Sequence, residues 1–240
     1  MSGHQIYPSP QDAAEHCGDF ILQLLKETLA TQPKAALAIS GGSTPRPMFE
    51  HMAKARFDWS RVDLFWVDER AVPPTDSQSN YRMANETLIQ AAEIPEPNVH
   101  RILAELDPAE AADQYAEEIR GFFALRPGEM PRFDVIHRGV GPDVHTASLF
   151  PGEPLIDDRE GLVAAVYVEK MHSSRITMLP GVLLAARHTA MLVCGADKVD
   201  AVEHIFHGPT DSKKYPAQAM ARDDGTTWFF DVAAAQPLAT

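Results

Sequence analysis

Short apolar runs alternate along the chain with longer segments in which apolar residues recur every three or four positions. The apolar runs predict strands, at 35–39, 62–67, 99–103, 133–136, 162–167, 174–178, 189–194 and 226–230. The periodic segments predict helices that begin at capping or proline residues, at 10–29, 45–53, 79–91, 107–125, 180–184 and after 197. Because strands and helices alternate, we predict an α/β fold: a mostly parallel sheet with helices on both faces, forming a single domain over residues 1–240.

The composition is that of an ordinary globular protein, with 45% hydrophobic and 23% charged residues. The net charge of -13 argues against a surface that binds nucleic acid or an anionic membrane. Cys17 and Cys194 lie far apart and match neither a zinc motif nor a disulfide framework. Neither a secretory signal nor an apolar run of about 20 residues is visible, so we expect a cytoplasmic protein.

A glycine-rich turn, SGGSTP (40–45), follows the predicted strand at 35–39 and leads into a predicted helix. Glycines let successive amides point into one concavity, and the start of the helix adds positive potential. Ser43 and Thr44 add hydroxyl donors. A phosphate would fit this turn, but a plain strand-to-helix turn with a Ser/Thr cap explains the same residues. The lysine of a nucleotide-binding loop is missing.

A second candidate site follows the strand at 133–136. A turn with two glycines leads to Asp143 and His145, and a helix-compatible segment from His145 ends at Pro151 and Gly152. This order predicts that Asp143 and His145 lie at the carboxyl end of a strand, where open α/β sheets bind ligands. An imidazole there could act as a general base, with its tautomer held by the aspartate. Alternatively, Asp143 caps the helix and His145 only packs, which is the commoner meaning of an isolated D-x-H pattern.

Charged residues also lie close to other predicted strands. Asp68-Glu69-Arg70 follow the strand at 62–67 and form either a solvated rim or part of a cleft. Arg175 interrupts the apolar run at 174–178. Lys198 is in the first turn of a predicted helix, where the helix dipole disfavours a cation. Such a lysine either serves an anion or is simply exposed to solvent.

Several segments, taken together and in this order, resemble 6-phosphogluconolactonases. They are SGGSTP (40–45), VDER (67–70), SNY (79–81), GxGxDxHTASLFPG (139–152), RIT (175–177), GADK (195–198), PAQ (216–218) and WxxD (228–231). The resemblance implies a Rossmann-like α/β domain of the type shared with sugar-phosphate isomerases. It also implies hydrolysis, without metal or cofactor, of a small phosphorylated sugar lactone, 6-phospho-D-glucono-1,5-lactone, in the pentose phosphate pathway.

Carried over by position, the resemblance also implies roles for individual residues. The residues that would hold the substrate phosphate are Gly42, Ser43, Thr44, Arg175 and Lys198. His145 would be the general base that takes a proton from water as it attacks the lactone carbonyl, and Asp143 would orient it. Arg70 would line the cleft near the sugar hydroxyls or the developing oxyanion.

This chain departs from the family pattern at a few positions. His137-Arg138 stands where the family usually has an apolar pair, and Val144 stands where it usually has glycine. If that position requires a positive φ, a β-branched residue there is strained by about 1–3 kcal/mol, with the risk of re-aiming His145. If φ is negative, Val144 only adds bulk, and Pro142 further stiffens the turn.

Two alternatives to a lactonase follow from these residues. A glucosamine-6-phosphate deaminase/isomerase would need a further carboxylate after the histidine, where this chain has Phe150. A catalytically impaired sugar-phosphate binding protein would keep the phosphate site without turnover. Since Asp143, His145 and Arg70 are all present, we predict an enzyme. We expect a monomer or a weak homo-oligomer.

Overall fold

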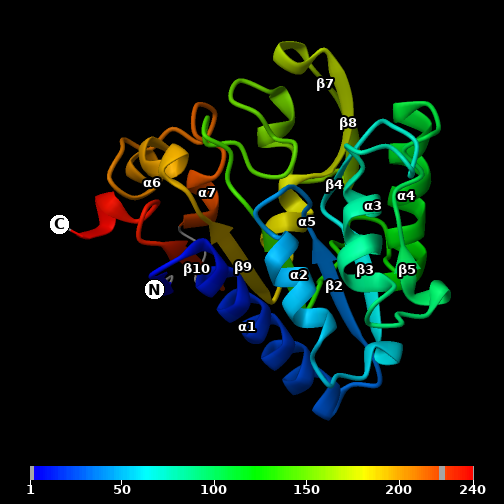
Figure 1. The fold of residues 1–240 in the computed structure, drawn as a ribbon. Coiled ribbons are helices and arrows are strands. Elements are labelled where there is room, and N and C mark those ends of the chain that lie inside the picture. Colours follow the sequence, from blue (N-terminus) through cyan, green and yellow to red (C-terminus); the bar gives the residue numbers. More distant parts are fainter. Residues whose placement is uncertain (1–2, 222–224, 240) are drawn as a thin grey trace.

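The computed structural model describes residues 3–221 and 225–239, which contain two sheets (Figure 1). The larger sheet has seven strands in the order β1-β10-β9-β6-β2-β3-β5, and every neighbouring pair is parallel. Its strands are β1 (Gly3–Tyr7), β2 (Ala35–Ile39), β3 (Val62–Trp66), β5 (Val99–His100), β6 (Val135–Arg138), β9 (His188–Val193) and β10 (Thr226–Asp231). This sheet confirms the predicted α/β class.

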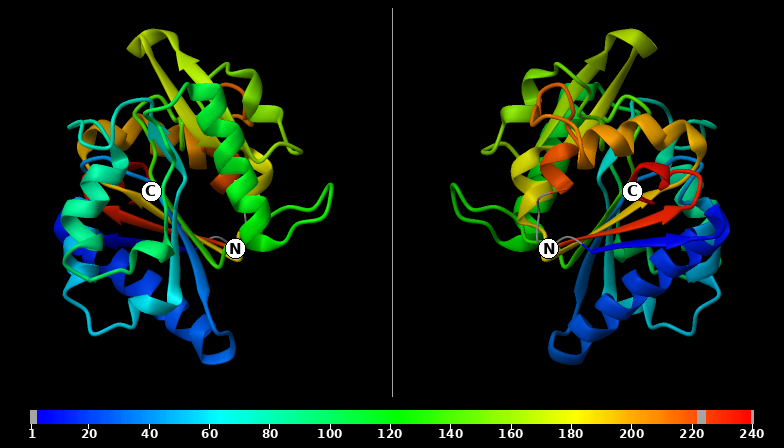
Figure 2. Two further views of the ribbon diagram at one scale, coloured as in Figure 1. Left: turned by 90° about the vertical axis from the view of Figure 1, so that its right-hand side faces the viewer. Right: turned by 90° about the vertical axis from the view of Figure 1, so that its left-hand side faces the viewer.

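Helices cover both faces of this sheet. They are α1 (Pro10–Thr31), α2 (Arg46–Ala53), α3 (Asn80–Ala84), α4 (Pro108–Phe123), α5 (Pro180–Ala185), α6 (Val199–Phe206) and α7 (Gln218–Ala221). Figure 2 shows α1, α2 and α3 on one side of the sheet and α4 on the other. Ser9 caps α1 and Asp107 caps α4 through their side-chain oxygens. Within the described part of the chain, no helix has the length and apolar character needed to cross a membrane.

The core lies in layers on the two faces of the large sheet. All residues of β2 and β3 are buried, as expected for central parallel strands. Along β9, Leu192 packs into the cluster that includes α1, whereas Met191 and Val193 pack with α6. Alternate side chains of one strand therefore hold helices on opposite faces. On the α4 side, Tyr115 Oη donates to the Trp66 carbonyl oxygen at 3.0 Å.

A smaller sheet of three antiparallel strands lies beside the large one. It consists of β4 (Asp68–Arg70), β8 (Ser173–Met178) and β7 (Val163–Val168), in that order. The strands β7 and β8 were predicted, but not their antiparallel pairing outside the main sheet. They form a hairpin, here called the arm, that projects from the body of the molecule (Figure 1).

Some expectations about local structure are wrong. The helix predicted from His145 does not form, because Thr146 pairs with Leu149 in an antiparallel bridge and Ala147 has a left-handed φ of 53°. Strand β1 was not predicted, and neither was the short helix α7. A turn follows β10, where Asp231 Oδ1 accepts a hydrogen bond from the Ala234 amide at 2.9 Å.

The strand order identifies where a ligand site is expected. From β2 the chain moves to β3 and β5 on one side, and later to β6, β9 and β10 on the other. The direction therefore reverses between β2 and β6, and such a switch point leaves a crevice at the carboxyl ends of the strands. The turn after β2 and the loop after β6 both begin there. These are the two candidate sites of the sequence, now brought together.

Candidate active site

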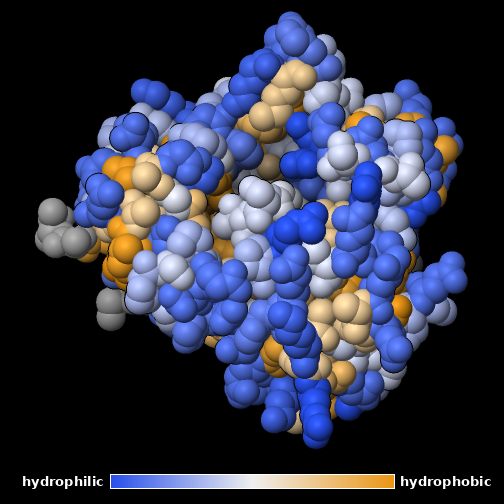
Figure 3. All heavy atoms as spheres, in the orientation of Figure 1, coloured by the Kyte–Doolittle hydropathy of each residue, from blue (hydrophilic) through white to orange (hydrophobic). Residues whose placement is uncertain are grey.

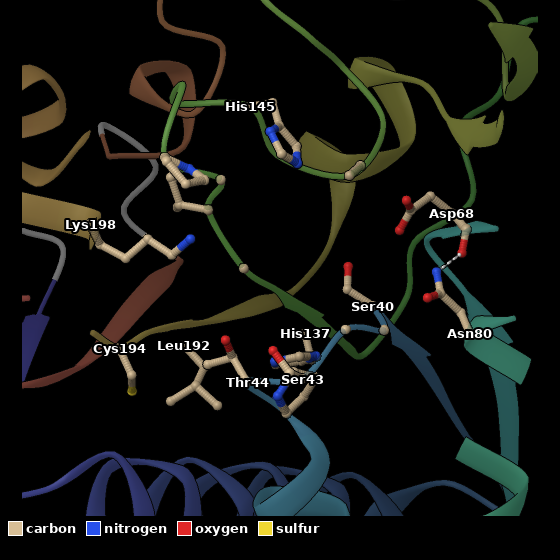
Figure 4. Close-up of a pocket in the computed structure, with 18 of the residues that line it drawn as sticks. Ser40, Ser43, Thr44, Asp68, Asn80, His137, His145, Leu192, Cys194 and Lys198 are labelled. Carbon is tan, nitrogen blue, oxygen red and sulfur yellow. Dashed lines mark hydrogen bonds between the residues drawn. The ribbon is translucent and has the colours of Figure 1, made fainter. Parts of the chain in front are cut away.

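A cavity of about 230 Å³ opens at this edge of the large sheet (Figure 4). In Figure 3 the surface is hollowed below the arm, with mostly hydrophilic side chains around the hollow. Six of the eight predicted site residues line the cavity: Gly42, Ser43, Thr44, Arg70, His145 and Lys198. Asp143 contacts His145 from outside this lining, and Arg175 lies on β8 opposite Arg70.

The turn after β2 forms one wall of the cavity and leads into α2. Gly42 has φ of 106°, a conformation that a side chain would strain. Gly41 passes so close to Asn80 that any Cβ atom there would collide with the Asn80 side chain. Both glycines are therefore required by the path of the backbone. With Ser43 and Thr44 next to the start of α2, the turn presents hydroxyls and backbone amides to an anion.

Asp143 and His145 form a hydrogen-bonded pair on the opposite wall. The distance from His145 Nδ1 to Asp143 Oδ1 is 2.5 Å. Because the carboxylate occupies Nδ1, Nε2 is left as the ring nitrogen available to a ligand or water. Any Cβ atom on Gly141 would collide with this ring, so only glycine leaves room for it. Partial burial raises the pKa of Asp143, but hydrogen bonds from His145 and Lys170 outweigh it and hold that pKa well below its ordinary value.

Val144, between these two residues, has φ of 66° and is therefore in the left-handed region. The sequence analysis predicted strain at Val144 if its φ is positive, and the φ of 66° meets that condition. The Val144 side chain is nevertheless 2% exposed and packs with Val140 and Met191. Its carbonyl oxygen accepts a hydrogen bond from the Ala217 amide at 3.0 Å. Packing on both sides thus holds the strained residue in place while the Asp143–His145 pair stays formed.

Lys170 connects the arm to this pair. The sequence gave no indication that Lys170 belongs to the site. Its Nζ atom bonds Asp143 Oδ2 and also lies 4.6 Å from the centre of the Phe150 ring. Phe150 in turn packs against His145, with the ring centres 4.3 Å apart. Each carboxylate oxygen of Asp143 therefore has one partner, His145 or Lys170. The Phe150 ring packs against the His145 ring and restricts its movement. Because 26 residues separate Lys170 from Asp143, no local motif could reveal this contact.

The basic side chains assigned to the site lie in two places around the cavity. Lys198 lines it with 13% of its side chain exposed and pairs with Asp197 at 3.0 Å. Arg70 lines it from β4, where Arg175 is its direct partner on β8. Burial and the neighbouring charge of Arg70 lower the pKa of Arg175 from its ordinary value. Two like charges side by side favour an anionic ligand.

Glu69 explains why the VDER and SNY segments occur together. Its buried carboxylate accepts hydrogen bonds from the backbone amides of Asn80 and Tyr81, both at 2.7 Å, and from Ser79 Oγ at 3.1 Å. A carboxylate is well placed at a helix N-terminus, where amides lack intrahelical partners. Burial raises the pKa of Glu69, although these hydrogen bonds oppose the shift. Glu69 thus positions α3, and with it Asn80 at the cavity.

Other polar residues also line the cavity, and some of them were missed in the sequence. Asp68, which the sequence placed either in a solvated rim or in a cleft, lines the cavity and accepts a hydrogen bond from Ser148 Oγ at 2.7 Å. Ser40, Asn80 and His137 also line it, and each has a buried polar atom that lacks a hydrogen-bond partner among residues 3–221 and 225–239. Buried polar atoms are nearly always paired, so these atoms are available to a ligand. Ser40 follows β2, Asn80 begins α3 and His137 lies in β6. These separate segments gave no local signal beyond the unusual His137.

Comparisons with known proteins agree with this geometry. The model of the family described as glucosamine-6-phosphate isomerases/6-phosphogluconolactonase matches residues 8–229. The 6-phosphogluconolactonase of Nostoc sp. is 34% identical over 221 residues, covering 92% of this chain and 91% of that protein.

Solved structures show the same likeness. The crystal structure of the devB protein is 33% identical with a TM-score of 0.88, covering 98% of this chain and 99% of that one. The 6-phosphogluconolactonase from Thermotoga maritima is 27% identical with a TM-score of 0.81, covering 96% of this chain and 99% of that one. The chain therefore belongs to the glucosamine-6-phosphate isomerase/6-phosphogluconolactonase family.

Proposed function

We propose that this protein hydrolyses 6-phospho-D-glucono-1,5-lactone to 6-phosphogluconate, with His145 as the general base. The observation that carries the proposal is the placement of the Asp143–His145 pair and the turn after β2 on facing walls of one cavity. A ligand with a phosphate at one end and a carbonyl at the other fits that arrangement. Family membership and the name of the Nostoc relative support the same activity.

In this proposal the phosphate is held by the turn after β2. Gly42, Ser43 and Thr44 supply amides and hydroxyls, and Lys198 supplies charge from the start of α6. Arg175 completes the anion site through its position beside Arg70. Binding energy from the phosphate would fix the lactone ring, so that its carbonyl lies within reach of His145.

The chemical step needs a base and a place for the negative charge. His145 Nε2 takes a proton from water as the water oxygen bonds to the lactone carbonyl carbon. The bond from that carbon to the ring oxygen then breaks, and the leaving oxygen takes up the proton. Asp143 holds the imidazole orientation and stabilises the imidazolium that forms between these steps. Arg70 lines the cavity where it can stabilise the oxyanion.

The position of Phe150 favours a lactonase over a deaminase. Its ring packs 4.3 Å from that of His145, at the place where the deaminase reaction would need a second acid–base group. A benzyl group cannot transfer protons. The intact Asp143–His145 pair likewise favours turnover over a binding protein, because phosphate binding alone has no use for a paired imidazole and carboxylate.

The experiment that tests the proposal measures hydrolysis of freshly generated 6-phosphogluconolactone, coupled to 6-phosphogluconate dehydrogenase, with the spontaneous rate subtracted. We expect clear activity for the natural protein and a loss of about 10²–10⁴-fold in kcat for His145→Ala with little change in KM. Glucosamine 6-phosphate, tested in parallel, should give no ammonia. A natural protein that does not exceed the spontaneous rate would contradict the proposal.

A further inference from the structure

His137, at the end of β6, is a buried histidine without the partners that buried histidines normally have. Its side chain is 1% exposed, and neither ring nitrogen has a hydrogen-bond partner in the described part of the chain. A neutral imidazole carries one donor and one acceptor, and burying both unpaired costs stability. A histidine that served only packing could be replaced by an apolar residue at no loss.

The groups around the His137 ring show where a hydrogen-bond partner for its nitrogens could lie. Phe49 of α2 meets the ring edge-to-face, with the ring centres 6.0 Å apart. Leu192 and Cys194 line the cavity beside it and offer no strong acceptor or donor. His137 is one of the residues that line the cavity, where it lies next to Ser43 and Thr44 (Figure 4), and its two nitrogens are covered.

The backbone ties His137 to the anion turn. The Ser40 amide, where that turn begins, donates to the His137 carbonyl oxygen at 3.2 Å. The ring is therefore held at the base of the turn by the ladder between β2 and β6. Burial, with the charge of Arg138 added, lowers the pKa of His137 to about 3, so the ring is neutral near pH 7 and keeps one N–H donor.

We propose that His137 is a substrate-contacting residue that donates a ring N–H hydrogen bond to the phosphate held by the turn after β2. This inference rests on the proposed function, because that function supplies the phosphate. This bond adds a ring N–H donor to the hydroxyls of Ser43 and Thr44 and the amides of the turn, which line the same cavity. It gives this chain an anion contact that an apolar side chain at the same position would lack.

The test compares His137→Leu with His137→Gln, which keeps an N–H donor. The control is His188→Leu, which replaces an exposed histidine at the far end of the neighbouring strand β9. We expect His137→Leu to raise KM for the lactone roughly tenfold to hundredfold, with kcat nearly unchanged. His137→Gln should keep much of the affinity, and His188→Leu should behave like the natural protein.

Two measurements separate this role from a structural one. Without ligand, His137→Leu should raise Tm by at least about 2 °C, because an unpaired buried polar group is removed. Inorganic phosphate should raise Tm of the natural protein more than that of His137→Leu. An unchanged KM together with an undiminished phosphate effect in His137→Leu would overturn the inference. If His137→Leu does not fold, ring ¹⁵N signals of the natural protein decide, since the His137 nitrogens must shift on phosphate addition.

The outcomes also distinguish this inference from the proposed function. If the natural protein hydrolyses the lactone and His137→Leu has the same KM and the same phosphate effect on Tm, only the role of His137 is overturned. No turnover, combined with phosphate stabilisation that depends on His137, overturns only the lactonase activity. A natural protein that neither hydrolyses the lactone nor is stabilised by phosphate overturns both.

Discussion

Asp143 Oδ1 lies 2.5 Å from His145 Nδ1, and this contact leaves Nε2 as the nitrogen that would act on substrate in the proposed mechanism. We predict that Asp143→Asn lowers kcat by about 10²-fold or more with KM nearly unchanged, because an amide can donate to Nδ1 and leave the proton on Nε2. Asp200→Asn, which changes an exposed acid on α6, serves as the control. Steady-state kinetics on the lactone check this. A rise in KM alone would contradict the orienting role.

Val144→Gly tests whether the left-handed backbone at this position is strained. Glycine relieves the strain at φ of 66° but removes a buried side chain. Val140→Gly is the matched control, since Val140 packs in the same cluster and its φ is not positive. We predict that Val144→Gly costs about 1–3 kcal/mol less unfolding free energy than Val140→Gly.

Urea denaturation of both variants measures this difference. Equal costs would mean that Val144 stores no strain. Because the Asp143–His145 pair is already formed beside Val144, we also expect Val144→Gly to leave kcat within about twofold of the natural value. A large gain in activity would instead show that Val144 impairs the base.

The two cations assigned to the phosphate should differ in effect. Lys198→Ala should raise KM about tenfold or more, because Lys198 lines the cavity and a hydrogen bond to a charged group is lost. Arg175→Ala should raise KM less, since Arg175 reaches the site beside Arg70 rather than from the cavity wall. Lys26→Ala, on an exposed position of α1, is the control. An unchanged KM for Arg175→Ala would remove it from the phosphate site.

His100 should make stability depend on pH. Burial opposes its charge, but the hydrogen bonds that His100 donates to the carboxylates of Asp63 and Glu118 raise the pKa of His100 to about 9. Because this folded-state pKa lies above the ordinary value of 6.5, the contribution is fully present below pH 6.5 and disappears as pH rises through 9. We predict that His100→Gln loses about 1–2 kcal/mol at pH 6 and almost nothing at pH 10. Urea unfolding at both pH values measures this; an equal loss at both would exclude the charge effect.

The main sheet could be predicted because its central strands are continuous apolar runs. The strand at 35–39 was located to the residue, since burial on both faces leaves no polar position in it. Strand β1 was not predicted because four of its five residues are exposed, and this edge strand carries no apolar run. Strand β4 was not predicted because Asp68, Glu69 and Arg70 are all charged. It forms a strand through its antiparallel pairing with β8, which its own sequence does not indicate.

The candidate site was predictable where one short segment holds the chemistry. The Asp143–His145 pair and the Ser43–Thr44 turn are local patterns, and the fold brings both to one cavity. Asn80 and Lys170 depend on contacts between distant segments, which periodicity does not encode. The sequence marked His137 as unusual, but only the packing of β6 against α2 shows that its nitrogens are unpaired.

The contact between Lys170 and Asp143 links the arm to the proposed base, His145. The Asp143 carboxylate contacts both His145 and Lys170, so the contact with the arm and the protonation of Asp143 are reciprocally linked. The Lys170 contact lowers the pKa of Asp143, and protonation of Asp143 weakens that contact by the same free energy. A hairpin that projects away from the sheet thereby influences the charge of a carboxylate beside the cavity.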